Sequence, residues 1–271
     1  MLLSTEYLSR CYFWHYTKIK WADSILKNGY FYVNCIAEMN DRDEKKLHGG
    51  EEHKVHILCF CNCNAEKIPM WYLYSGIDGR GAAVGISSKY MKSFLKQIEV
   101  YEDKGLLNKL KWDEDYSIEY GYVFYQKASD KKSVYYRSKW YEMDDSECDS
   151  FNKDNYFLKS YPWEYEKEFR IVIKTKSEEM NGKPVYIRLP ESYIANMRLR
   201  FAPEIKKVDR DMERRFTGLK KIPEDNTTYS KLNIRMNLMK NAKEVIFEDM
   251  KYRAKNKQNP QLKGKRFREE K

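Results

Sequence analysis

Several common signatures are missing from this chain of 271 residues, and each absence excludes a class of protein. No stretch approaches the roughly 18 consecutive apolar residues that a membrane-spanning helix needs, so we expect no membrane partner. Residues 1–10 have no basic segment followed by an apolar one, which argues against a secretory signal peptide. Neither the glycine-rich dinucleotide fingerprint nor the Walker A loop occurs, so the sequence supports neither a Rossmann nor a P-loop nucleotide site.

The six cysteines predict reduced thiols, and with them a cytoplasmic protein. Cys59, Cys61 and Cys63 alternate within one apolar segment, and neighbours on the same face of a strand do not readily form disulfides. His53 and His56 lie nearby, which raises the alternative of a zinc site. A structural zinc site usually takes two C-x₂₋₄-C pairs, however, and the C-x-C-x-C spacing does not supply them. We therefore expect no metal.

Basic residues exceed acidic ones, and they are concentrated near the C-terminal end of the sequence. The formal net charge is +10, from 51 Lys and Arg against 41 Asp and Glu. Residues 251–271 are dense in Lys and Arg and are interrupted by Pro260 and Gly264, so we predict a solvated, disordered basic tail. It follows a single α+β domain that we assign to residues 1–250. Such a tail can contact a polyanion such as nucleic acid, or simply keep the protein soluble.

The pattern of apolar residues predicts an α+β fold with mostly antiparallel strands, because strands and helices follow each other without regular βαβ alternation. The expected strands are rich in β-branched and aromatic residues and cover 12–17, 30–35, 55–61, 82–87, 120–125, 169–174, 185–189 and 245–248. The expected helices cover 18–28, 68–75, 88–97, 149–160, 208–219 and 229–239. Gly29 should end the first helix, since glycine readily takes the left-handed conformation. Of the first six strands, all but 30–35 should share one sheet system.

Residues 159–173, KSYPWEYEKEFRIVI, form the most informative segment. Glu164, Glu166 and Glu168 alternate, so in an extended chain they point to one face, with Arg170 following on the same side. Stacked like charges repel each other unless a cation or a substrate lies opposite. Beside a large aromatic residue, acids at the mouth of a buried strand can stabilise a positively charged transition state. The alternatives are an exposed edge strand with solvated glutamates and an ion pair within the strand.

Four short motifs, taken in order, resemble a large bacterial family of stand-alone proteins of unknown function. They are His15-Tyr16-Thr17 before a helix ending at Gly29, Asn40-Asp41 with Glu44, Met70-Trp71 with Tyr74 and Gly81, and Trp163-x-Tyr165-Glu166-x-Glu168-x-Arg170. The resemblance extends over residues 12–174. That family in turn is similar to the ADP-ribosyltransferase-like fold, a split, mostly antiparallel β-structure with peripheral helices that binds NAD in a cleft.

The resemblance implies an NAD-dependent mono-ADP-ribosyltransferase or NAD glycohydrolase, acting as a bacterial toxin or anti-phage defence effector. It implies that His15, with Tyr16 beside it, binds NAD through a ribose hydroxyl. It further implies that Glu168 or Glu166 acts with His15 in catalysis, by supporting the nicotinamide ribose as its glycosidic bond breaks. The chemistry is consistent, because loss of nicotinamide leaves an oxocarbenium-like ribose that a carboxylate stabilises. The acceptor would be a protein, a nucleic acid, a small molecule or water.

Other residues of the same motifs supply the remaining contacts to NAD in this interpretation. Trp71 and Tyr74 offer aromatic faces for nicotinamide or adenine. Arg170, in preference to Arg80, offers a planar fork for the pyrophosphate oxygens. Structural alternatives exist for each residue. Trp71 and Tyr74, three positions apart, can simply pack a short helix, and His15 can be a strand histidine bonded to a backbone carbonyl.

A different class of function is also compatible with the sequence. The aromatic residues, 15% of the chain, and the basic tail fit a non-catalytic module that binds nucleic acid, because stacking together with Lys and Arg holds single strands. The two hypotheses differ in geometry. An enzyme should bring His15 and the Glu166/Glu168 pair into one cleft, whereas a binding module should present a continuous basic and aromatic face.

Overall fold

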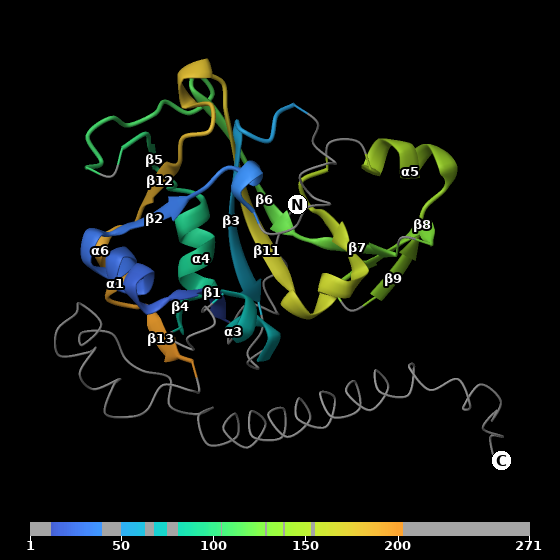
Figure 1. Cartoon of the computed structure of the whole chain (residues 1–271), viewed down its shortest axis with the longest axis horizontal. Coiled ribbons are helices and arrows are strands. Elements are labelled where there is room, and N and C mark those ends of the chain that lie inside the picture. Colours follow the sequence, from blue (N-terminus) through green and yellow to red (C-terminus); the bar gives the residue numbers. More distant parts are fainter. Residues whose placement is uncertain are drawn as a thin grey trace, which may run out of the picture. The chain divides into compact units, whose positions relative to one another are not determined.

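The computed structural model describes residues 12–39, 50–62, 68–74, 81–103, 105–127, 129–137, 139–152 and 155–202 (Figure 1). Within these residues the chain has an α+β fold, and the named strands pair antiparallel in every case but one. The predicted fold class, α+β with mostly antiparallel strands, is therefore confirmed. The helices in these ranges are too short or too polar to cross a membrane.

A six-stranded antiparallel sheet forms the centre of the fold, in the order β13-β4-β1-β3-β11-β6. Its strands are β1 (Tyr12–Lys18), β3 (Val55–Asn62), β4 (Gly81–Ser87), β6 (Tyr116–Tyr122), β11 (Glu168–Thr175) and β13 (Arg198–Phe201). β3 and β11 are buried at nearly every position, because both faces of the sheet are covered. Gly85 of β4 lies so close to Trp14 that a Cβ atom there would come within 2.6 Å of the indole ring. Each of the five segments expected to share a sheet contributes to this one.

Short helices connect the strands. They are α1 (Ile19–Asn28), α3 (Ile68–Tyr74), α4 (Ser88–Leu95), α5 (Asp145–Asn152), α6 (Glu191–Ile194) and the 3₁₀ helices η2 (Ile36–Glu38), η3 (Tyr161–Glu166) and η4 (Glu178–Met180). The residues whose spacing predicted α1 are the ones it buries: Ile19, Ala22, Ile25 and Leu26. Gly29 ends this helix as predicted, with a φ of 70° and its N–H donated to the carbonyl oxygen of Ile25 at 3.0 Å.

Two smaller sheets flank the central one. The three-stranded sheet, in the order β2-β12-β5, consists of β2 (Tyr30–Val33), β5 (Val100–Tyr101) and β12 (Val185–Arg188). The four-stranded sheet, in the order β10-β7-β8-β9, consists of β7 (Phe124–Lys127), β8 (Asp130–Tyr136), β9 (Lys139–Glu142) and β10 (Leu158–Ser160), and its β10–β7 pair is parallel. Figure 1 shows the three-stranded sheet with α1 and α4 on one side of β3 and β11, and the four-stranded sheet with α5 on the other.

The structure corrects the elements predicted between residues 120 and 160. The expected strand 120–125 is divided at Val123, because β6 belongs to the central sheet and β7 to the four-stranded one. The expected helix 149–160 is wrong in its second half, since α5 ends at Asn152 and β10 follows. The β8–β9 hairpin is absent from the prediction, because its many charged residues hide the alternation that marks a strand.

The acidic segment is bent where the sequence suggested an extended strand. Tyr161–Glu166 forms η3, and β11 begins only at Glu168. Between these two elements Lys167 has a φ of 46°, in the left-handed region. Glu164 therefore does not share one strand face with the two later acids, and the predicted row of three stacked carboxylates is wrong.

Some predictions fall outside the described residues. These are the helices 208–219 and 229–239, the strand 245–248, the domain boundary at residue 250, the basic tail 251–271, and the residues Asn40, Asp41, Glu44, Cys63 and Arg80. They remain predictions. All of the described residues belong to one compact unit, Met1–Asn226.

Candidate active site

Strand register sorts the predicted site residues onto the two faces of the central sheet. Trp14 is paired with Cys61, and Cys61 is paired in turn with Glu168. Paired residues of neighbouring strands point to the same face, and so do residues two positions apart on one strand. Tyr16 and Arg170 therefore lie on the same face as Glu168. We call the face that carries these five residues the carboxylate face.

His15 lies on the opposite face, because it alternates with Trp14 and Tyr16 along β1. Its ring packs edge-on against Phe31 and Phe60, with centroids 5.4 and 5.9 Å away. Its Nδ1 lies 3.0 Å from the carbonyl oxygen of Cys59, to which it donates. Burial lowers the pKa of His15, and the backbone hydrogen bond only partly opposes this. His15 is thus a packed histidine separated from both carboxylates by the sheet, contrary to the predicted convergence.

Four charged side chains form a buried cluster on the carboxylate face. Lys159, Glu166, Glu168 and Arg170 are each at most 4% exposed. The Nζ of Lys159 lies 2.6 Å from Oε2 of Glu166 and 3.4 Å from Oε2 of Glu168. Arg170 donates from Nε and Nη2 to the two oxygens of Glu168, at 2.8 and 3.0 Å. Two cations thus balance two carboxylates, which is the condition for burying charges at all.

The backbone explains why the two acids meet the same lysine. Glu166 ends η3 and Glu168 begins β11, and the left-handed turn at Lys167 folds the chain back between them. Lys159 comes from β10, where it is paired with Tyr125 of β7. The four-stranded sheet therefore supplies the lysine of the cluster, and the bend at Lys167 brings the two carboxylates to it.

Aromatic side chains surround the cluster. The hydroxyl of Tyr74 donates to Oε1 of Glu166 at 2.7 Å, and the hydroxyl of Tyr125 accepts the backbone N–H of Glu168 at 2.8 Å. The indole of Trp163 lies 4.7 Å from Nζ of Lys159. Tyr74 and Trp163 are partly exposed, so the cluster borders solvent through these two rings.

The surroundings shift the pKa values of the two carboxyl groups in opposite directions. Burial, together with the nearby charge of Glu168, raises the pKa of Glu166 to about 7. Burial also disfavours the ionised form of Glu168, but Arg170 and Lys159 outweigh it and hold the pKa of Glu168 below its ordinary value. Burial and the carboxylate of Glu166 raise the pKa of Tyr74, so that phenol stays protonated. One acid that titrates near neutrality beside one that stays ionised is an arrangement suited to acid–base chemistry.

The raised pKa of Glu166 has a consequence for stability. Between pH 4.5 and about 7 the folded protein binds more protons than the unfolded chain, so the free energy of unfolding falls as the pH rises through this window. The difference between 4.5 and about 7 corresponds to roughly 3 kcal/mol. We expect urea denaturation to show the wild-type protein losing about this much relative to Glu166→Gln between pH 4.5 and 8. A difference between the two proteins that is constant with pH would contradict this assignment.

The remaining predicted residues divide into two groups. Tyr74 contacts Glu166 directly, as the hydrogen bond above shows. Trp71 and Tyr16 instead pack edge-on against each other, 4.7 Å between centroids, and are only 2% and 6% exposed. Arg170 is fully buried and donates to Glu168 and, through Nη1, to the carbonyl oxygen of Tyr156 at 2.6 Å. Its structural role is to neutralise Glu168, which corrects its predicted role as a pyrophosphate ligand.

Lys159 is the charged member of the site that sequence reasoning missed, and Tyr125 is a missed ring beside it. Lys159 lies inside the predicted helix 149–160, where a lysine attracts no attention. The available signal was a single lysine within a run of apolar and aromatic residues, YFLKSY. A buried lysine of this kind needs a carboxylate partner, and three acids follow within ten residues.

The strand cysteines also lie beside the cluster. Cys59 and Cys61 are not in a disulfide. Burial and the charge of Glu168 raise the pKa of Cys59 well above its ordinary value, which makes this thiol a poor nucleophile. Among the residues that the structure describes, no group of three His, Cys, Asp or Glu side chains is arranged to hold a metal ion.

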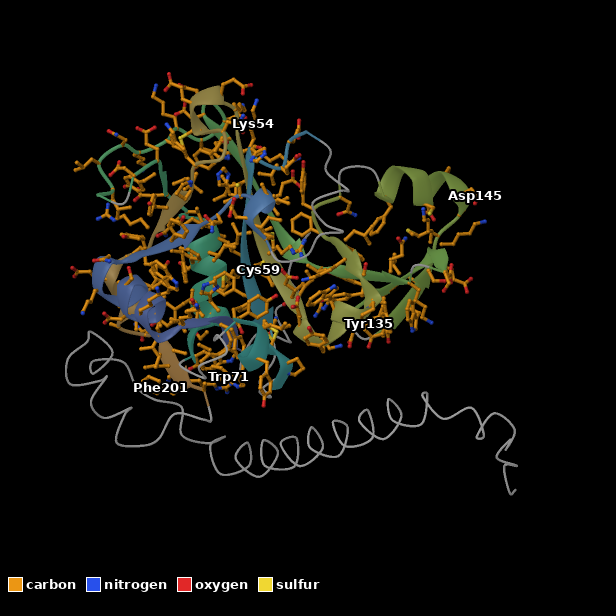
Figure 2. The ribbon with its side chains drawn as sticks, in the orientation of Figure 1. Lys54, Cys59, Trp71, Tyr135, Asp145 and Phe201 are labelled. Carbon is orange, nitrogen blue, oxygen red and sulfur yellow. The ribbon has the colours of Figure 1, made fainter. Side chains whose placement is uncertain are left out.

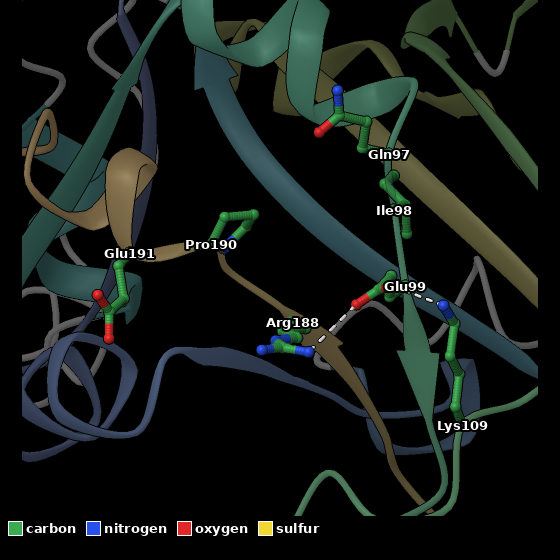
Figure 3. A pocket seen from close by; sticks show the side chains of 7 residues that line it. All are labelled: Gln97, Ile98, Glu99, Lys109, Arg188, Pro190 and Glu191. Atoms are coloured by element: carbon green, nitrogen blue, oxygen red, sulfur yellow. Dashed lines mark hydrogen bonds and ion pairs between the residues drawn. The ribbon is translucent and has the colours of Figure 1, made fainter.

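A surface cavity of about 630 Å³ lies away from the cluster, and its lining residues are Gln97, Ile98, Glu99, Lys109, Arg188, Pro190 and Glu191 (Figure 3). Glu99 pairs there with Lys109 at 2.5 Å and with Arg188 at 3.6 Å. None of the predicted site residues lines it. The cavity therefore adds nothing to the candidate site, which consists of the charged cluster and the rings around it.

The comparisons with known proteins do not assign a function to this arrangement of residues. The function has to be argued from the cluster itself: a carboxyl group that titrates near neutrality, an ionised partner, a lysine and bordering aromatic rings. Comparisons of the chain with models of protein families, with curated proteins and with solved structures gave no match.

Proposed function

We propose that this chain cleaves the bond between nicotinamide and ribose in NAD and passes the ADP-ribosyl group to an acceptor, as a mono-ADP-ribosyltransferase-like protein. The observation that carries the proposal is the pair Glu166 and Glu168, held in one cluster with opposite shifts of pKa. Breaking an N-glycosidic bond develops positive charge on the ribose, and nearby carboxylates stabilise that charge. The effector role implied by the resemblance stays a prediction.

Glu166 is the carboxylate that we assign to the reaction. Both oxygens of Glu168 are bonded to Arg170, whereas Oε1 of Glu166 accepts only the hydroxyl of Tyr74 among the contacts described here. A ribose hydroxyl can replace that phenol as donor. The pyridinium of NAD leaves as neutral nicotinamide with the bonding electrons, so the leaving group needs no proton. Glu166 instead takes the proton of the attacking acceptor, for which a pKa near 7 is well matched.

Substrate reaches Glu166 only when covering side chains move aside, because this residue is 1% exposed. Tyr74 and Trp163 are the partly exposed rings at the border of the cluster. We assign to them the flat wall against which nicotinamide stacks. Trp71 and Tyr16 support α3 from behind through their mutual contact.

The direct test is to incubate the purified protein with NAD and to measure free nicotinamide by chromatography between pH 6 and 8. We expect release of nicotinamide, with a rate that rises as the pH passes about 7, because Glu166 must be ionised to accept a proton. ADP-ribose in solution would identify water as acceptor, and labelled protein would identify transfer. A folded protein that releases no nicotinamide anywhere in this range would refute the proposal.

A further inference from the structure

The four-stranded sheet carries a row of side chains that begins at the buried cluster and ends at the surface. Lys159 of β10 is paired with Tyr125 of β7, Tyr125 with Tyr135 of β8, and Tyr135 with Trp140 of β9. Paired residues point to the same side of a sheet. Exposure increases along the row, from 3% at Tyr125 to 41% at Trp140. The row therefore runs from the lysine that contacts both carboxylates to an exposed ring.

Three rings at the outer end of this row form a platform. The centroids of Tyr135 and Trp140 are 5.2 Å apart, those of Trp140 and Tyr161 are 5.0 Å apart, and those of Tyr135 and Tyr161 are 5.6 Å apart. Tyr161 is the first residue of η3, whose last residue is Glu166. Figure 2 labels Tyr135 in the four-stranded sheet. We call Tyr135, Trp140 and Tyr161 the aromatic platform.

Lysines lie over all three rings. The Nζ of Lys127 is 4.5 Å from the centroid of Trp140 and 5.7 Å from that of Tyr161. The Nζ of Lys167 is 5.1 Å from the centroid of Tyr135. A ligand that stacks on Trp140 would replace the ammonium group of Lys127, which would then lie beside the ring in position to bind an anion.

The segment that carries Tyr135 and Trp140 is basic in composition. The segment from Phe124 to Glu142 contains five Lys or Arg and two Asp or Glu. Nearby, Glu164 is already paired with Lys167. The three ring planes are inclined to one another by 35° to 87°, and such ring faces beside positive charge fit a ligand with both aromatic rings and phosphates. Lysine is depleted at the centre of protein–protein interfaces, so this combination disfavours a protein partner.

We propose that the aromatic platform binds single-stranded nucleic acid, with bases stacked on its rings and phosphate bound by Lys127. A duplex hides the faces of its bases, which is why the single strand is the form that fits. A strand on this platform lies along the row that leads to Glu166. We therefore further infer that the bound nucleic acid is the acceptor of the ADP-ribosyl group. This second part of the inference rests on the proposed function.

In that reaction a nitrogen or oxygen of a base forms a bond to C1′ of the nicotinamide ribose, and the bond from C1′ to nicotinamide breaks. The electrons of the broken bond leave with nicotinamide. The proton of the attacking atom goes to Glu166. Two bonds break in this step: the bond from C1′ to nicotinamide and the bond from the attacking atom to its proton. The step therefore needs no metal, oxidant or reductant.

Binding is tested with the full chain and labelled single-stranded oligonucleotides, one of DNA and one of RNA, in the absence of NAD. Fluorescence anisotropy is measured at about 0.5 M salt, where contacts based on charge alone are weakened. Trp140→Ala is the test variant. Trp21→Ala is its matched control, because Trp21 is 50% exposed, has Nζ of Lys20 4.8 Å from its ring centroid, and belongs to α1. We expect Trp140→Ala to weaken binding by about 5- to 150-fold, and Trp21→Ala to leave it unchanged.

Two results would overturn the binding site: equal affinities of the two variants, or tighter binding of a duplex of the same sequence. Thermal melting of each variant shows that it is folded. Lys127→Gln leaves the rings intact and should reduce the slope of log affinity against log salt by about one.

Transfer of label from NAD to the oligonucleotide tests the acceptor role. Binding without transfer would refute that role alone, since the proposed function is judged separately by the release of nicotinamide. The comparison of DNA with RNA identifies the class of acceptor.

Discussion

Replacing Glu166 by Gln is expected to lower the rate of NAD cleavage by about 100- to 10,000-fold. The amide keeps the shape of the side chain but can neither accept a proton nor oppose the positive charge of the ribose. Initial rates of nicotinamide release measure the effect, and urea denaturation of the same samples shows whether the variant is folded. The choice of Glu166 over Glu168 rests on their contacts, since Arg170 holds both oxygens of Glu168.

Glu119→Gln is the matched control for this experiment. Glu119 lies in β6 with its side chain 56% exposed, and its nearest cation, Lys174, is 3.9 Å away. The same change of charge there should leave nicotinamide release within about twofold of wild type, because an exposed pair is worth little. If Glu166→Gln retained activity similar to Glu119→Gln, the assignment of Glu166 would be wrong.

Replacing Arg170 by Met is expected to lower the free energy of unfolding by about 3–5 kcal/mol. Arg170 is fully buried, and its removal leaves Glu168 with one of its two cationic partners missing. A buried carboxylate without sufficient compensation must either stay ionised at high energy or take up a proton. Denaturant unfolding at pH 7 measures the loss directly.

Arg188→Met provides the comparison, because Arg188 also pairs with a glutamate but is 55% exposed. The loss there should be below about 1 kcal/mol, since water and salt screen such a pair. Adding Glu168→Gln to Arg170→Met should restore part of the lost stability by removing the isolated charge. Similar losses for Arg170→Met and Arg188→Met would show that the cluster is not energetically coupled.

The structure bears differently on the parts of the NAD site that the sequence predicted. A packed His15 on the far face removes one part of the expected NAD site, while Lys159 and Tyr74 strengthen another around Glu166. The nucleic-acid alternative remains a prediction, and the aromatic platform that we propose for it lies in a four-stranded sheet of which the sequence predicted only the start of β7. The two functions are compatible, because the aromatic platform and the carboxylate cluster are the two ends of one row of paired residues.

Local patterns in the sequence determined most elements of the central sheet. β1, β3, β4 and β11 were predicted to within one residue at each end, because runs of β-branched and aromatic residues bounded by turn formers favour a strand wherever they are placed. The end of α1 at Gly29 followed from the same kind of local reasoning, since a left-handed residue is needed there. Such preferences depend only on neighbours within a few positions.

Only the tertiary structure decided which charges meet. His15 and Trp14 are adjacent in sequence yet face opposite sides of the sheet, and the side that carries the carboxylates is set by the register of β1, β3 and β11 together. Register depends on the turns and on how partner strands far apart in the sequence pack their faces together, so neighbours within a few positions do not decide it. Lys159 joined the site because a parallel pair of β10 with β7 carried it there. Burial then shifted the pKa of Glu166, since desolvation is a property of the folded surroundings and not of the residue.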